Sequence, residues 1–153
     1  NNMFKTKITK SKEVTPKWYL IDAKGRRLGK IASIASQLLL DKANPVMRDY
    51  LMPQAKVVII NASQIDHTEK KAISKLYTNY SGFPGGLKIS TMGELMAKFP
   101  ERVIEHAISG MLPKTKRGKQ IMSENLYVYP AAEHAHSGQQ AEFISIDVNA
   151  YKI

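Results

Sequence analysis

The chain has 153 residues and no cysteine. This absence excludes a disulfide framework, a metal site built on thiolates and a cysteine nucleophile, and it fits a reducing compartment. The sequence also lacks any run near the roughly 18 apolar residues that a membrane-spanning helix needs, and no signal-peptide core stands near its start. We therefore do not expect a membrane to be a partner.

Acidic residues are scarce, with 13 Asp and Glu against 23 Lys and Arg, so the net charge is +10 and the pI is near 9.7. Residues 1–119 carry 22 cations and 9 acids, whereas residues 120–153 carry 1 cation and 4 acids. Such a lopsided field attracts polyanions, and nucleic acid is the main candidate. An anionic membrane surface is the weaker alternative, because no predicted helix combines a basic face with an aromatic-rich apolar face.

Strand and helix patterns alternate along the chain, and 43% apolar residues are enough to fill one core. Strands are predicted at 18–23, 57–62 and 126–129, with a short edge strand at 76–80; helices are predicted at 31–39, 91–99 and 100–112. Thr91 and Glu94 have the spacing of a capping box at a helix start. The pattern predicts an α/β domain around a mostly parallel sheet of about four strands, covered on both faces.

The domain is assigned to residues 18–140, preceded by a basic arm at 1–17 and followed by a tail at 141–153. The arm holds Lys5 and Lys7 among five lysines and only one acid. Such a segment can become ordered against phosphates.

The densest positive stretch follows the helix predicted to end near residue 112. We expect Gly110 to end that helix in a left-handed conformation and Pro113 to prevent its continuation. Lys114, Lys116, Arg117 and Lys119 would then stand in a surface loop that contains a second glycine. The plain alternative is a solvated run of charge without a ligand.

A second cluster is the turn from Lys24 to Lys30, between the first strand and its helix. Gly25 and Gly29 are one residue too close for a P-loop, and no hydroxyl residue follows the lysine, so nucleotide binding is not expected. Arg26, Arg27 and Lys30 nevertheless surround a helix N-terminus, which suits a phosphate. The cluster leaves open a different class of protein, an α/β enzyme acting on a phosphorylated small molecule held at residues 25–30.

A third candidate site is the glycine-rich loop at 81–86. Gly82, Gly85 and Gly86 would allow close approach of a ligand to the backbone. Nearby aromatic and cationic side chains could stack on bases while they hold phosphates; these are Lys75, Tyr77, Tyr80, Phe83 and Lys88. The alternative is that the rings fill the core beside a tight turn.

Evidence for catalysis is weak. His134 and His136 could supply two metal ligands, but a third with suitable spacing is missing, and no serine has a Gly-x-Ser-x-Gly frame. We expect no enzyme activity, no metal and no cofactor, and we interpret the two histidines as facing RNA or the surface.

Several blocks, taken in order, resemble the bacterial-type large-subunit ribosomal protein L-thirteen family; they are 18–23, 25–30, 57–62, 80–88, 100–114 and 126–136. The resemblance implies a three-layer α/β/α fold and a structural protein that binds large-subunit ribosomal RNA early in assembly. Two departures are visible. Residues 52–56 replace an expected Asp-x-Gly-Asp stretch, and the span 118–126 is one residue longer than usual.

The sequence thus predicts a ribosomal RNA-binding protein in the cytoplasm or an organelle, with neighbouring large-subunit proteins as further partners. Recognition should be mainly of RNA shape and backbone. The predicted RNA-binding residues are Lys5, Lys7, Arg26, Arg27, Lys30, Lys75, Tyr80, Gly82, Gly85, Gly86, Lys88, Lys114, Lys116, Arg117, Lys119, His134 and His136.

Overall fold

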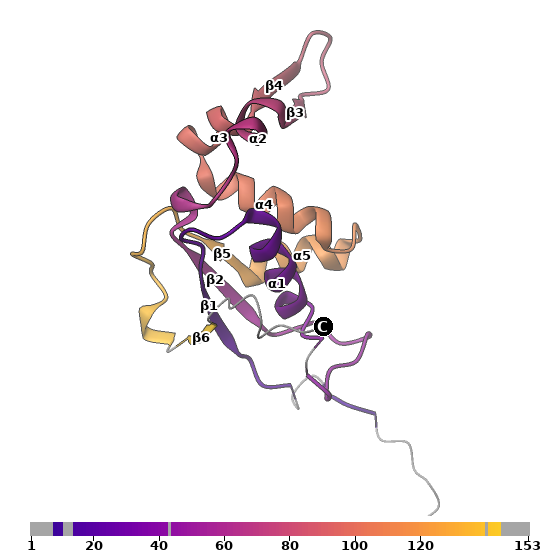
Figure 1. The fold of residues 1–153 in the computed structure, drawn as a ribbon. Coiled ribbons are helices and arrows are strands. Elements are labelled where there is room, and N and C mark those ends of the chain that lie inside the picture. The colour runs from indigo at the N-terminus through magenta and orange to yellow at the C-terminus, as the bar shows by residue number, and fades with distance from the viewer. Residues whose placement is uncertain (1–7, 11–13, 43, 140, 145–153) are drawn as a thin grey trace, which may run out of the picture.

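A computed structural model describes residues 8–10, 14–42, 44–139 and 141–144. The predicted arm residues Lys5 and Lys7 lie outside the described residues. Four parallel strands form the main sheet in the order β5-β2-β1-β6 (Figure 1); they are β1 Trp18–Asp22, β2 Lys56–Ile60, β5 Leu126–Val128 and β6 Glu142–Ile144. The predicted α/β class and parallel sheet are confirmed.

Three helices pack with one face of this sheet; they are α1 Leu28–Leu39, α4 Pro100–Met111 and α5 Lys116–Asn125. Ile21, Val57 and Ile59 project from the strands into one buried cluster with the apolar faces of these helices. All three side chains are fully buried. Each contributes about 1.5–3 kcal/mol by leaving water, so this cluster is the core of the molecule.

The opposite face of the sheet is covered differently. Trp18 stacks on Tyr127 with 5.8 Å between ring centroids, and the His136 ring lies 5.0 Å from Trp18 and 4.3 Å from Tyr127. In the part of the chain that the structure describes, this face carries stacked rings and the segment after β5, with the 3-10 turn Ser137–Gln139, rather than a second layer of α-helices. The expected three-layer α/β/α arrangement is therefore not seen there.

Residues 76–80 are not an edge strand of the main sheet. They form β3 Leu76–Tyr80, which pairs antiparallel with β4 Leu87–Thr91 in a separate two-stranded sheet. This hairpin projects from the body of the molecule, beside the helices α2 Glu69–Ser74 and α3 Met92–Lys98 (Figure 1). A 3-10 turn, Ala62–Gln64, follows β2 on the way to α2. We call α2, β3, β4 and α3 the hairpin unit, and the main sheet with α1, α4 and α5 the body.

The helix boundaries correct two predictions. The capping box of Thr91 and Glu94 is present at the start of α3, and Pro100 lies in the first turn of α4, as the sequence predicts. Gly110, however, lies inside α4, which ends when Leu112 turns to an extended conformation. Residues 116–119 are the first turn of α5 rather than a loop, because Thr115 caps that helix.

The segments outside the predicted domain contribute to the structure. Strand β6 pairs with β1 although the sequence suggested only a tail after residue 140. In the arm, Thr9 and Val14 are buried, and the Tyr50 hydroxyl donates a hydrogen bond to the carbonyl oxygen of Thr9 over 3.0 Å. Among the described residues, no helix is long and apolar enough to cross a membrane.

Candidate nucleic-acid interface

The positive stretch predicted as a loop forms a tight elbow between α4 and α5. The Thr115 side chain accepts a hydrogen bond from the backbone N–H of Gly118 over 3.4 Å. A Cβ atom on Gly118 would lie 1.9 Å from the carbonyl oxygen of Pro113, so only glycine permits this close approach. The elbow leaves Lys114, Lys116 and Lys119 exposed on the surface.

Arg117 differs from the three lysines because its guanidinium is already occupied. Its two terminal nitrogens donate hydrogen bonds to the carbonyl oxygens of Asp49 and Leu51. On the same helix, the buried Asn125 amide donates to the carbonyl oxygen of Pro53 over 2.9 Å. Arg117 therefore ties the irregular segment before β2 to α5, which is a structural role that its place in the positive run does not reveal.

Two hollows flank α4 and share His106. The elbow hollow is lined by His106, Ser109, Lys114 and Lys119, among others. The hairpin hollow lies between the hairpin unit and α4 and is lined by Tyr77, Lys88, Lys98, Arg102 and His106, among others. The shared histidine makes the two hollows neighbours along α4.

Lys98 and Arg102 were missed by the sequence reasoning. A signal was present for Arg102, since it precedes His106 by four residues, the spacing of one helical face, whereas Lys98 ends the preceding helix. The Arg102 guanidinium lies 4.4 Å from the centroid of the Phe99 ring, a cation–π contact that holds the side chain in place. The buried hydroxyl of Tyr77, in the same hollow, has no hydrogen-bond partner among the described residues.

A third hollow, the α1 groove, brings together cations that are far apart in the sequence. Arg27, Gly29 and Lys75 line it, together with Lys71 and His67. Arg27 precedes the first residue of α1, and the acid near it, Asp66, lies 3.9 Å away across a largely exposed ion pair. Asp66 is one acid against the three cations Arg27, Lys71 and Lys75, so the groove remains cationic.

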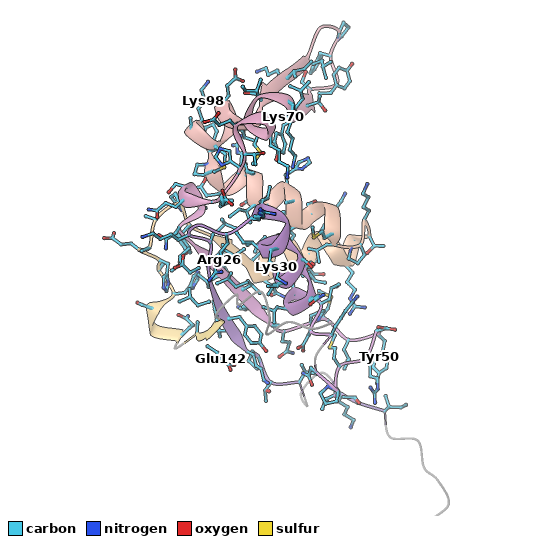
Figure 2. The ribbon with its side chains drawn as sticks, in the orientation of Figure 1. Arg26, Lys30, Tyr50, Lys70, Lys98 and Glu142 are labelled. Atoms are coloured by element: carbon cyan, nitrogen blue, oxygen red, sulfur yellow. The ribbon has the colours of Figure 1, made fainter. Side chains whose placement is uncertain are left out.

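Arg26 and Lys30 are not among the residues that line the α1 groove. Figure 2 shows both at the start of α1, and Lys70 and Lys98 on the hairpin unit. The structure thus joins Arg27 with Lys75 and leaves Arg26 and Lys30 as separate half-buried cations.

The glycine-rich loop closes the hairpin, and its glycines have internal reasons to be there. Gly85 has a φ of +73° and follows Pro84, and the N–H of Gly86 donates to the carbonyl oxygen of Phe83 over 2.9 Å. This combination is typical of a type II turn, which needs positive φ at its third residue. Gly82 also has a positive φ, of +87°. At Gly86 an added Cβ would lie 2.9 Å from the carbonyl oxygen of Phe83 and closer still to Ser81 Oγ. The three glycines are therefore explained without a ligand, and contact with RNA stays a prediction.

The aromatic side chains near this loop divide into two groups. Tyr77 packs edge-on against His106 at 5.1 Å, and the Lys75 ammonium lies 5.2 Å from the Tyr77 ring centroid. Tyr80 and Phe83 are 61% and 73% exposed. Packing thus accounts for Tyr77, whereas Tyr80 and Phe83 are free to meet a partner.

His134 and His136 pack against aromatic rings on the face of the sheet opposite the helices. The His136 ring contacts Trp18 and Tyr127, as described above, and the rings of His134 and His136 each lie 6.1 Å from that of Tyr129. His134 Nδ1 accepts a hydrogen bond from the backbone N–H of His136 over 3.3 Å. No cluster of three or more potential metal ligands occurs among the described residues. The predicted contact of His134 and His136 with RNA stays a prediction.

Comparison with known proteins gives consistent matches. The family model described as Ribosomal protein L13 matches residues 16–135, a range that contains all three hollows. A protein named "Large ribosomal subunit protein uL13" from Rippkaea orientalis is 39% identical over 145 residues, 95% of each chain. The protein of that name from Geobacillus kaustophilus is 42% identical over 137 residues, 90% of this chain and 94% of its own. The one from Synechococcus elongatus is 39% identical over 148 residues, 97% of each chain.

Proposed function

This chain belongs to the ribosomal protein L13 family, and on that premise we propose that it holds large-subunit ribosomal RNA through the three cationic hollows. As a member of this family it is a structural constituent of the large ribosomal subunit and not an enzyme. Its place is in the ribosome with ribosomal RNA and other proteins. Because these relatives are bacterial, the proposed setting is a ribosome of the bacterial type, in a bacterial cytoplasm or an organelle.

The observation that carries the proposal is that the two hollows adjoin at His106 of α4. Cations from four elements and from the elbow border them; they are Lys88 of β4, Lys98 of α3, Arg102 of α4, Lys114 of the elbow and Lys119 of α5. Arg102 and Gly110 alone are eight residues apart on one helix, which corresponds to about 12 Å. A surface of this length fits an extended polyanion better than one small phosphorylated ligand.

The chemistry of these hollows favours recognition of RNA shape and backbone. Their charged groups are ammonium and guanidinium ions, which bind phosphate oxygens without reading sequence. Tyr80 and Phe83 at the hairpin tip add exposed rings on which an unpaired base could stack. We propose that binding by these groups helps to fold ribosomal RNA during subunit assembly.

The test compares two double variants with the same loss of charge. Arg102→Gln with Lys119→Gln removes one cation from each of the two hollows on α4, whereas Lys42→Gln with Lys70→Gln removes two exposed cations outside all three hollows. Affinity for a large-subunit ribosomal RNA fragment is measured across a range of salt concentrations. The first variant should make the slope of log K against log salt shallower by about 0.7–0.9 for each phosphate that the protein no longer neutralises.

The control variant should leave that slope nearly unchanged. If both variants change it equally, binding depends on net charge alone and the proposal for the hollows is wrong. If neither changes it, the cations around α4 are merely solvated.

A further inference from the structure

The hairpin has one face made of apolar and uncharged side chains, and the described structure leaves its large members mostly exposed. The register places residues 76, 78 and 80 opposite residues 91, 89 and 87, and paired residues share a face. We call Leu76, Thr78, Tyr80, Leu87, Ile89 and Thr91 the apolar hairpin face. Its four large members are 55–61% exposed.

The other face of the same two strands is chemically different. It carries Tyr77, Asn79, Lys88 and Ser90, all of which line the hairpin hollow. Tyr77 on this face packs against His106 of α4. The hairpin therefore separates a polar, cationic side that is packed on the body from an apolar side that is directed away from it.

An isolated two-stranded sheet is at best marginally stable in water. This hairpin has no fully buried residue in either strand, and the large side chains of its apolar face remain in water. Contiguous exposed apolar patches are rare on proteins that act alone and usually mark an interaction surface. The apolar hairpin face therefore leaves apolar surface in water that a partner molecule could cover.

We propose that the apolar hairpin face docks on a neighbouring protein of the large ribosomal subunit, through aliphatic or aromatic side chains bordered by acidic ones. This inference rests on the proposed function, because it requires the chain to be in the subunit. Ribosomal RNA is the poorer occupant of most of the face, since Leu76, Leu87 and Ile89 can neither pair with phosphates nor stack as rings do. Tyr80, at the loop end of the face, is the one member that can stack on a base. The six strand positions of the face include no cation.

Charge also disfavours a second copy of this chain as the occupant. Lys70 and Lys71 lie on α2, which packs beside β4 in the same unit. Two copies packed face to face would bring these like charges together, whereas a partner with an acidic rim would neutralise them. The hairpin then stands between RNA on its cationic side and protein on its apolar side.

The first test uses a photoreactive amino acid, benzoylphenylalanine, at position 89 or at position 88 of the full-length chain. Large subunits assembled in cells that express each variant are purified and irradiated. From position 89 we expect an adduct that resists ribonuclease and whose peptide belongs to another large-subunit protein. From position 88, on the opposite face, we expect an adduct that ribonuclease removes.

The outcomes separate this inference from the proposed function. An RNA adduct from position 89, a dimer of this chain, or no adduct while position 88 reacts would overturn the docking of a protein. Failure of the unmodified chain to bind a ribosomal RNA fragment would instead overturn the proposed function.

A second test replaces Leu87 and Ile89 by Thr, which retains strand-forming ability while it removes apolar surface. Lys88→Thr is the matched control on the other face. The double variant should bind the RNA fragment with unchanged affinity but be recovered in large subunits several-fold less than the unmodified chain, in competition with it. The control should weaken RNA binding instead. Equal recovery of the double variant and the unmodified chain would contradict the proposal.

Discussion

The body buries the apolar side chains of its strands, whereas the hairpin unit leaves many of its own exposed. In β2 of the body, Val57, Val58 and Ile59 are completely buried. In the hairpin, Leu87 and Ile89 are more than half exposed although they occupy the same kind of position, a strand with branched or aliphatic residues. The body is thus stabilised by its own core, whereas the hairpin leaves its large apolar side chains mostly in water, which is the basis of the proposed docking.

The largest expected effect comes from making one substitution in both regions. Ile59→Ala removes a fully buried side chain from the core and should lower the free energy of unfolding by about 2–5 kcal/mol. Ile89→Ala, on the apolar hairpin face, should lower it by less than about 1 kcal/mol. Urea unfolding of both variants measures the contrast. Similar losses would mean that the free hairpin already has a packed core.

A second pair of variants sharpens the account of the elbow. Gly118→Ala would place a methyl group against the Pro113 carbonyl oxygen and should cost about 1–3 kcal/mol. Gly110→Ala has no atom within 4 Å of the added Cβ and lies inside a helix, so it should stabilise the protein by about 0.5–1 kcal/mol. Melting temperatures should therefore shift in opposite directions. A gain from both substitutions would show that the elbow is looser than described.

The smallest difference in stability is expected between substitutions of Arg117 and Lys119, two cations in the first turn of α5. Arg117→Gln breaks the hydrogen bonds to Asp49 and Leu51 and should cost about 1–2 kcal/mol, because hydrogen bonds from a charged group are stronger than average. Lys119→Gln changes an exposed charge and should leave stability within about 0.5 kcal/mol. In RNA binding the order should be reversed, with the larger loss for Lys119→Gln. Equal stability of the two variants would remove the structural role assigned to Arg117.

Local patterns predicted much of the fold. The buried strand predicted at 57–62, which the structure has at Lys56–Ile60, the capping box at Thr91 and Pro100 in a first helix turn each depend on neighbouring residues alone. The last two residues of the predicted strand instead turn into the 3-10 segment Ala62–Gln64. The predictions failed where distant contacts decided the outcome. Gly110 does not end α4, since the packed helix tolerates the roughly 1 kcal/mol that glycine costs there.

The candidate site shows the same limit. The sequence identified Lys75, Lys88, Lys114 and Lys119, which line the hollows, because cations cluster visibly along the chain. It could not show that Arg117 is held by carbonyl groups 66 and 68 residues away. Nor could it show that the strand at 76–80 leaves the main sheet, since its apolar residues look like those of a core strand until its pairing is known.

The contrast between body and hairpin is tested most directly by amide hydrogen exchange, measured on the free chain and on the chain within large subunits. In the free chain, the amides of Val57–Ile60 should exchange slowly, whereas those of β3 and β4 should exchange faster by orders of magnitude, since local opening of the hairpin costs less than global unfolding. In the subunit, the hairpin amides should become as protected as those of β2. Hairpin amides that are already as slow as those of β2 in the free chain, or that stay fast in the subunit, would contradict the account.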